Sequence, residues 1–369
     1  MAIQVKLETF TSRTFTLSDG INIFFTDSGA PRNSTDYTTV LVLHGSAFNG
    51  HGFEKLHDYA HEYNIRTIVW NRRDYPGSTR YTNEELAELQ QGKRVFIDRL
   101  GFQVADFIKQ LIEKEKIPKA TLDRKAGGVA IMGWSMGTAT AMALFSDPSI
   151  ISPEVHDHLK EYVKDLILDV LITHARKIDS PHLCFAYEIP EGEKIYDPWT
   201  DPNCTTPEEL YQNFGFWVSS FYDHPDPLSG KLSDMDIRTR TNEATLIKWT
   251  PEELSKYYTQ DAAVRSELRM YVPPMQDTLR DITQRSFYDE RFIDSYFPDV
   301  KVSLIVGTRT NWQCLWGPVE TMRRHDMVVA EGGKVRPMWL YWIEGGNHFA
   351  HWEMPDALME KIAAGTMAR

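Results

Sequence analysis

The residues best suited to chemistry are a serine between two glycines and a histidine near the end of the chain. Residues 133–137 read Gly-Trp-Ser-Met-Gly, directly after the apolar run 128–132 and before a segment with helical character. A nucleophile on a strained strand-to-helix turn needs neighbours without side chains, because the strand and the helix approach each other closely there. The free N–H groups at the start of the helix favour an anion. We therefore predict that Ser135 is a catalytic nucleophile.

The predicted general base is His348, in the run Glu-Gly-Gly-Asn-His-Phe at residues 344–349. This run follows an expected strand and precedes the last expected helix, so His348 should lie at the edge of the sheet where Ser135 emerges. His351, three residues later, is the alternative base. We favour His348 because the preceding glycines allow the loop to fold over Ser135.

The elements that must position these residues alternate between strands and helices, which predicts an α/β sheet with right-handed crossovers. The fully apolar run at 39–43 indicates a strand buried on both faces. Residues 152–173 are interpreted as a helix, because their apolar residues fall at helical spacing and Pro153 suits a first turn. The expected strands are 14–17, 21–25, 39–43, 65–71, 128–133, 182–187, 300–306 and 338–343, and the expected helices are 53–63, 95–114, 135–145, 152–173, 318–330 and 355–363.

Residues 189–297 interrupt this alternation. They are rich in aromatic residues, and proline and aspartate break them into short helical segments. We expect a cap domain at 189–297 on a core formed by 1–188 and 298–369. Most of its rings should build the cap's own core, and a minority should line an apolar pocket over the sheet.

Two further motifs make the sequence similar to the α/β-hydrolase superfamily, specifically to members with a cap domain and a serine nucleophile. Residues 43–46 read Leu-His-Gly-Ser, and residues 73–78 read Arg-Asp-Tyr-Pro-Gly-Ser. The resemblance implies a mostly parallel eight-stranded sheet with helices on both faces and an inserted, mainly helical cap. It also implies that the backbone N–H groups of Ser46 and Met136 form the oxyanion hole, the pair of donors that binds the negative oxygen of a tetrahedral intermediate.

The acid that orients the histidine is less obvious in this chain. Many members of the superfamily carry an Asp after the strand that follows the cap, but residues 307–318 contain no acidic residue. A second position known in the superfamily is the end of the strand before the cap, where residues 185–190 read Phe-Ala-Tyr-Glu-Ile-Pro. Fungal resorcylic-acid lactonases are similar in this detail, and we expect Glu188 to be the acid. Asp169 is an alternative if the helix expected at 152–173 is not formed, and Glu191, Glu193 and a dyad without an acid are further alternatives.

This constellation predicts a serine hydrolase that cleaves a carboxylic ester or lactone of a hydrophobic small molecule through an acyl-enzyme. The same triad can serve C–C bond hydrolysis, acyl transfer or a lyase reaction, and the fold can also carry a ligand receptor without catalysis. These alternatives remain open. The expected substrate contacts are Trp134, Phe48, Asn311, Trp312 and Trp217.

Composition excludes several other classes of function. The formal charge of -12 repels nucleic acids and anionic membrane surfaces. The three cysteines are scattered, and no metal-ligand cluster or dinucleotide fingerprint is present in the sequence, so we expect reduced thiols, no metal and no cofactor. No apolar run reaches signal-peptide or membrane-span length. We expect a cytoplasmic protein, possibly a homodimer.

Overall fold

The structure is a computed structural model, which describes residues 10–169, 185–187, 189–190 and 195–368. Within these residues, eight strands form one sheet in the order β1-β2-β4-β3-β5-β6-β7-β8. The first two strands pair antiparallel, β2 pairs antiparallel with β4, and the remaining neighbours are parallel. The strands are β1 (Thr11–Thr16), β2 (Asn22–Asp27), β3 (Thr38–Leu43), β4 (Ile65–Trp70), β5 (Val129–Trp134), β6 (Val163–Asp169), β7 (Lys301–Gly307) and β8 (Met338–Ile343). The predicted mostly parallel, eight-stranded sheet is confirmed.

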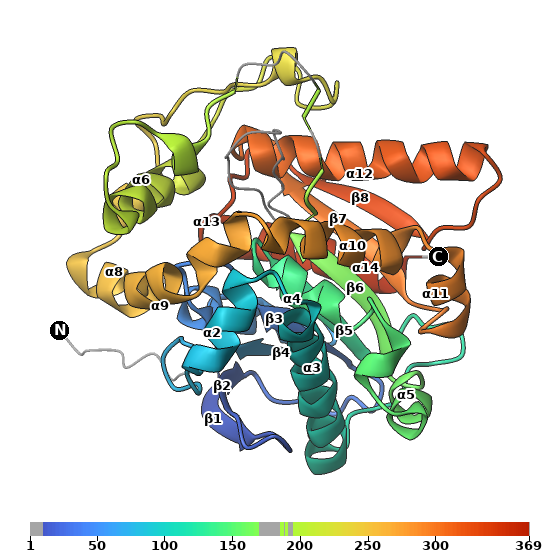
Figure 1. Ribbon diagram of the computed structural model, residues 1–369. Coiled ribbons are helices and arrows are strands. Elements are labelled where there is room, and N and C mark those ends of the chain that lie inside the picture. The colour runs from blue at the N-terminus through green and yellow to red at the C-terminus, as the bar shows by residue number, and fades with distance from the viewer. Residues whose placement is uncertain (1–9, 170–184, 188, 191–194, 369) are drawn as a thin grey trace.

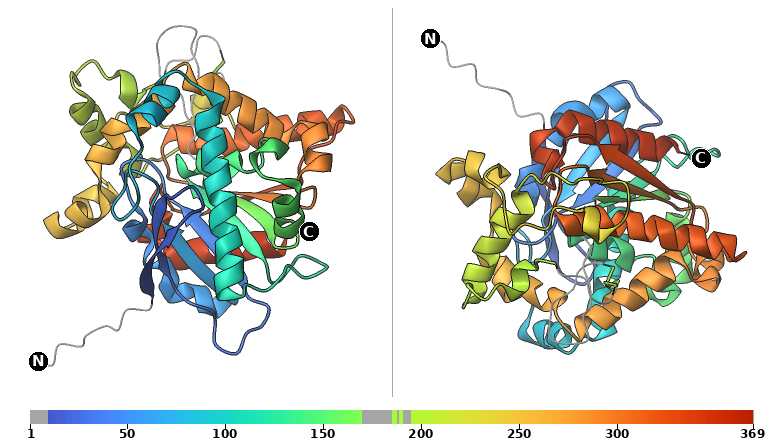
Figure 2. Two further views of the ribbon diagram at one scale, coloured as in Figure 1. Left: turned by 60° about the horizontal axis from the view of Figure 1, so that its bottom comes forward. Right: turned by 90° about the horizontal axis from the view of Figure 1, so that it is seen from above.

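Helices cover both faces of this sheet (Figures 1 and 2). Helix α3 (Arg94–Glu115) packs on α4 (Gly137–Ala143), which contacts β3 and β5. On the other face, α1 (Leu56–Ala60) packs on β4 and on α14 (Pro355–Met367), and α14 contacts β6, β7 and β8. The central strands β3, β4, β5 and β6 are buried along their whole length, as expected for strands covered by helices on both faces.

The remaining helical elements of the core connect these strands and helices. They are η1 (Gly50–Phe53), η2 (His61–Tyr63), α2 (Asn83–Gln90), η3 (Pro148–Ile150), α5 (Pro153–Leu159), α12 (Trp312–Ala330) and α13 (Ala350–Glu353). None of the described helices has the length and apolar character needed to cross a membrane.

The predicted helix at 152–173 is wrong. Its first part is α5 (Pro153–Leu159), and its second part is the buried central strand β6 (Val163–Asp169). Lys164 and Asp165 interrupt the apolar pattern of this strand and look like solvent-facing positions of a helix. Both are in fact buried. Their burial is compensated because the Lys164 ammonium donates to the Thr366 carbonyl at 2.8 Å and lies 3.3 Å from the Asp165 carboxylate.

The strand predicted at 182–187 is not part of the described sheet either. Residues 182–184 lie outside the described residues, and the sheet passes directly from β6 to β7. Phe185 and Tyr187 are buried but belong to no strand of that sheet. Among the residues that the structure describes, the last strand before the inserted region is therefore β6, which ends at Asp169.

The described part of the inserted region between β6 and β7 is mainly helical. Figure 1 shows α6, α8 and α9 gathered at one end of the sheet, whereas α10 and α11 extend along its side. An aromatic core stabilises the region, with the Trp199 ring stacked 4.7 Å from Phe214 and 4.6 Å from Tyr271. Its elements are η4 (Pro198–Thr200), α6 (Pro207–Ser219), η5 (Leu232–Asp234), α7 (Thr245–Lys248), α8 (Pro251–Tyr257), α9 (Gln260–Arg265), η6 (Glu267–Tyr271), α10 (Met275–Phe287) and α11 (Glu290–Ser295).

Candidate active site

Ser135 occupies a sharp turn between β5 and α4. Its φ of 54° lies in the left-handed region, which is rarely adopted by residues with a side chain and marks local strain. Both neighbouring glycines are required sterically. A Cβ on Gly133 would lie 2.5 Å from the Thr138 Cα, and a Cβ on Gly137 would lie 2.0 Å from the Leu43 carbonyl oxygen. The turn is therefore packed too tightly for any residue but glycine at these two positions.

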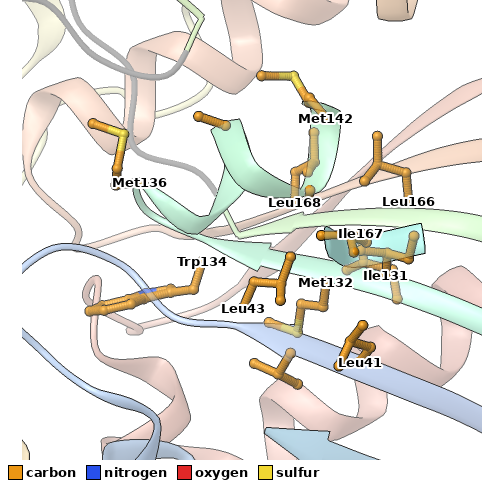
Figure 3. Packing of buried hydrophobic residues seen from close by; sticks show 14 of the residues in the cluster. Leu41, Leu43, Ile131, Met132, Trp134, Met136, Met142, Leu166, Ile167 and Leu168 are labelled. Atoms are coloured by element: carbon orange, nitrogen blue, oxygen red, sulfur yellow. The ribbon is translucent and has the colours of Figure 1, made fainter. Parts of the chain in front are cut away.

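Figure 3 shows the hydrophobic residues of β3, β5 and β6 that pack around this turn. Trp134 and Met136 flank the serine and extend to different sides of the turn. The Ser135 N–H donates to the Asp169 carbonyl at 2.8 Å, so the end of β6 also holds the turn. A buried, rigid support of this kind is what a precisely placed nucleophile needs.

The loop after β3 lies directly against the serine side chain. A Cβ on Gly45 would lie 2.5 Å from the Ser135 Cβ and 3.0 Å from its Oγ. The next residue, Ser46, is buried, and no acceptor for its N–H is found among the described residues. Ala47 has a φ of 65° and donates its N–H to the Tyr75 hydroxyl at 2.8 Å. The structure thus places the loop that contains Ser46 beside Ser135, while Met136 directly follows the serine at the start of α4.

His348 lies close to the same turn. Its ring stacks on the Trp134 ring with centroids 4.7 Å apart, and its carbonyl accepts a 2.9 Å hydrogen bond from the Trp134 Nε1. His348 is 2 % exposed, and this burial lowers its pKa to about 3. Its Nε2 is buried and makes no hydrogen bond with the described residues. The imidazole is therefore neutral at ordinary pH and has a nitrogen that can accept a proton.

Asn347 holds the loop that carries this histidine. Its Nδ2 donates to the Ser219 carbonyl at 2.8 Å and to the Thr245 hydroxyl at 2.9 Å, and its Oδ1 accepts the Phe349 N–H at 2.9 Å. Ser219 ends α6 and Thr245 begins α7, so the inserted region fixes the histidine loop. The sequence indicated no role for Asn347.

His351, the alternative base, is packed between aromatic rings. It stacks on Phe53 at 3.9 Å and lies 4.6 Å from the Trp134 ring. Burial lowers its pKa well below the usual range, and the nearby His348 and Lys55 lower it further. Both histidines thus contact the tryptophan that precedes Ser135.

The predicted acid, Glu188, lies outside the described residues. Asp169, the alternative, ends β6, and its backbone carbonyl accepts the Ser135 N–H. Its carboxyl is buried, and burial raises its pKa well above the usual range. Its Oδ2 has no hydrogen-bond partner in the part of the chain that the structure describes.

The residues predicted to contact substrate lie in two environments. Phe48 belongs to an aromatic cluster that joins core and inserted region, because its ring lies 4.8 Å from Phe349 and 5.1 Å from Tyr258. Asn311 caps α12 by accepting the N–H groups of Gln313 and Cys314. The other three, Trp134, Trp217 and Trp312, are fully buried, and the Trp312 Nε1 donates to the Tyr196 carbonyl at 2.8 Å.

The sequence analysis also missed a buried polar cluster beside Ser46. Arg72 and Glu267 form an ion pair, Glu267 also accepts the Ser46 hydroxyl, and the Tyr271 hydroxyl donates to the Ser46 Oγ at 2.5 Å. No signal in the sequence joins Arg72 to Glu267, because they are far apart in the chain. Among the described residues, no group of three or more His, Cys, Asp or Glu side chains is arranged to hold a metal ion.

Comparison with known proteins gives the family and the fold. Residues 40–361 match the model of the Alpha/beta hydrolase family. No curated protein sequence gives a significant match.

Similar solved structures include a membrane phospholipase A described as a bacterial virulence factor (16 % identity, TM-score 0.51, 97 % of this chain and 86 % of that chain). They also include a bromoperoxidase from Bacillus anthracis (14 % identity, TM-score 0.49, 95 % of this chain and 98 % of that chain). A third is an esterase from Exiguobacterium antarcticum (16 % identity, TM-score 0.48, 97 % of this chain and 100 % of that chain). At these identities the likeness concerns the fold alone. The family match spans the chain from β3 into α14 and includes the strand-turn-helix around Ser135. The chain therefore belongs to the alpha/beta hydrolase family.

Proposed function

We propose that the protein is a serine hydrolase that cleaves a carboxylic ester or lactone of a hydrophobic small molecule through an acyl-enzyme. The observation that carries this proposal is the conformation of Ser135, a non-glycine residue at a φ of 54° on a turn where both flanking glycines are required. Strain of this kind is retained where it exposes a reactive group.

In the proposed reaction, the Ser135 Oγ attacks the substrate carbonyl while the His348 Nε2 takes the hydroxyl proton. The resulting oxyanion accepts hydrogen bonds from the Ser46 and Met136 N–H groups. The tetrahedral intermediate then collapses, the alcohol leaves with the proton from His348, and the acyl group remains on Ser135. Water, deprotonated by His348, releases the acid and restores the serine. His348 contributes to this step a neutral imidazole whose buried Nε2 makes no hydrogen bond with the described residues.

We propose Glu188 as the acid of the triad, with Asp169 as the alternative, because Asp169 ends β6, the last described strand before the inserted region. Burial is the cause of the lowered pKa of His348 and of the raised pKa of Asp169, and neither shift includes an effect of the other group's charge. A carboxylate that orients a catalytic histidine would raise the pKa of that histidine. Asp169 thus shows no sign of this coupling. Glu188→Gln should lower kcat by several orders of magnitude, whereas Asp169→Asn should have a smaller effect. A larger loss of kcat in Asp169→Asn than in Glu188→Gln would identify Asp169 as the acid of the triad.

The experiment that tests the proposed function compares hydrolysis of nitrophenyl esters of increasing acyl length and of aryl lactones. The variants are Ser135→Ala, His348→Ala and, as a matched control, His351→Gln. We expect the first two to lose activity and fluorophosphonate labelling of residue 135, and the control to keep both at equal thermal stability. Labelling of wild-type Ser135 without turnover of any ester would favour transfer or lyase chemistry. A folded wild-type protein that is neither labelled nor active would refute the proposal and favour a receptor.

A further inference from the structure

The peptide unit between Gly45 and Ser46 is held from its carbonyl side. The Gly45 carbonyl accepts a 3.0 Å hydrogen bond from the Arg72 guanidinium and lies 2.8 Å from the His44 Nδ1. Because a trans peptide places its C=O and its N–H on opposite sides, these contacts determine where the Ser46 N–H points. The α-carbon of Gly45 lies against the Ser135 side chain, since a Cβ on Gly45 would come within 2.5 Å of the Ser135 Cβ.

The second donor to this carbonyl is a neutral histidine of fixed tautomer. The Arg72 backbone N–H donates to the His44 Nε2 at 3.0 Å, so the proton of the ring is on Nδ1 and is donated to the Gly45 carbonyl. Burial, and then the positive charge of Arg72, lower the pKa of His44 well below its usual range. Arg72 therefore acts on this peptide twice, through its guanidinium and through the histidine that its backbone orients.

The Arg72 guanidinium is itself held by the inserted region. Its partner Glu267 is the first residue of η6, and the two side chains are 7 % and 5 % exposed. The second carboxylate oxygen of Glu267 accepts the Ser46 hydroxyl, which in turn accepts the Tyr271 hydroxyl. A guanidinium buried without a carboxylate partner is strongly destabilising, so the ion pair with Glu267 is what allows Arg72 to be buried at this position.

A carbonyl that accepts hydrogen bonds from a cation and an imidazole carries more negative charge, and the N–H of the same peptide unit becomes a stronger donor. In this loop that N–H belongs to Ser46. We propose that Arg72, held by Glu267, is a positioning residue that orients and polarises the Gly45–Ser46 peptide, so that an ion pair between core and inserted region sets the strength of the oxyanion hole. The inference rests on the proposed function and goes beyond it by assigning a role to two residues outside the triad.

The test replaces the ion pair without leaving a buried charge. Arg72→Met/Glu267→Met substitutes apolar side chains of similar length for both partners, which a fold usually tolerates. A second variant, Arg72→Lys, keeps the positive charge beside Glu267 but lacks the planar guanidinium, whose Nη2 donates both to Glu267 and to the Gly45 carbonyl. The matched control is Arg73→Met/Glu85→Met, because Arg73 follows Arg72 in the same loop and pairs with Glu85 of α2, and the hydrogen bonds that the structure describes for this pair do not include Gly45.

The readout is the ratio of kcat/KM for an oxygen ester to that for its thiono analogue, in which sulfur replaces the carbonyl oxygen. Sulfur accepts hydrogen bonds poorly, so this ratio reports on the oxyanion hole and not on general damage to the fold. Loss of a whole oxyanion donor costs about 10² to 10³ in kcat, and we expect weakening of one donor to cost about 10-fold. The double Met variant should lose about this factor in kcat on the oxygen ester with little change in KM, and its ratio should fall by a similar factor.

We expect Arg72→Lys to change kcat and the ratio in the same direction by a smaller factor, and the control pair to leave both unchanged. A ratio equal to that of wild type in both Arg72 variants would overturn the inference while wild-type hydrolysis through Ser135 still supports the proposed function. A wild-type protein without hydrolysis or labelling would overturn both. Thermal unfolding of each variant identifies one that has not folded, and Arg72→Lys then decides alone.

Discussion

Asn347 offers a quantitative test of how the inserted region positions the catalytic histidine. Its amide makes three buried hydrogen bonds at 2.8–2.9 Å, to Ser219, to Thr245 and from Phe349. Each such bond contributes about 1 kcal/mol to the free energy of unfolding, and a buried group left unpaired costs about 1 to 3 kcal/mol. Asn347→Ala removes all three and leaves the Phe349 N–H and the Ser219 carbonyl unpaired. We therefore expect the free energy of unfolding to fall by about 3 kcal/mol.

Urea unfolding followed by tryptophan fluorescence measures this change. Asn203→Ala is the control, because the Asn203 side chain is exposed and its hydrogen bond is to the neighbouring Asp201, and it should stay within about 0.5 kcal/mol of wild type. Asn347→Asp should cost at least as much as the alanine variant, since it places a carboxylate oxygen against the Ser219 carbonyl. If Asn347→Ala unfolds at the same urea concentration as wild type, the account of this loop is wrong.

The same substitution should lower activity, because the loop would no longer hold His348 at a fixed distance from the serine. Displacements of about 1 Å at a catalytic group cost up to about 10² in rate. We expect kcat for an ester substrate to fall by on the order of 10-fold to 10²-fold, with a smaller change in KM. Unchanged kcat in a destabilised Asn347→Ala protein would show that the tether stabilises the fold without positioning the base.

Two further predictions concern packing and protonation. Gly45→Ala should lower activity by at least about 10²-fold, because its Cβ would lie 2.5 Å from the Ser135 Cβ, whereas Gly52→Ala, with its nearest contact at 3.8 Å, should keep wild-type kcat/KM. Equal activity of the two would contradict the placement of Gly45. Burial lowers the pKa of His57 to about 4 in the folded protein, so below about pH 6.5 the unfolded chain binds a proton that the folded chain does not. This difference lowers the free energy of unfolding as the pH falls. Between about pH 7.5 and 5, the free energy of unfolding should drop by about 2 kcal/mol more in wild type than in His57→Gln. If urea unfolding gives the same pH dependence of the free energy of unfolding for wild type and His57→Gln, this prediction is wrong.

Much of the fold could be predicted because the local pattern and the tertiary environment agree. The strand at 338–343 is predicted with its observed bounds, and the turn around Ser135 follows from glycine spacing between an apolar run and a helix. Strand β6 could not be predicted in this way. Its charged residues are buried and are satisfied by partners far along the chain, such as the Thr366 carbonyl that accepts from Lys164. Local spacing carries no information about such partners.

The site shows the same division. Ser135, Gly45 and His348 come from short motifs whose steric requirements can be seen in the sequence, and the structure brings Gly45 and His348 to the turn that carries Ser135. The contacts that hold these motifs come from elsewhere. Arg72 joins the oxyanion loop to Glu267, and these residues are separated by 195 positions. Only the packing of the inserted region on the core reveals this contact.

A trapped acyl-enzyme would show directly that Ser135 is the nucleophile. Wild-type protein is mixed with a nitrophenyl ester, quenched in acid within the first turnover, and analysed by intact mass and peptide mapping. We expect a mass increase equal to one acyl group, located on Ser135 and missing in Ser135→Ala. Turnover of the ester with no acyl group on Ser135 at any time would contradict this role of Ser135.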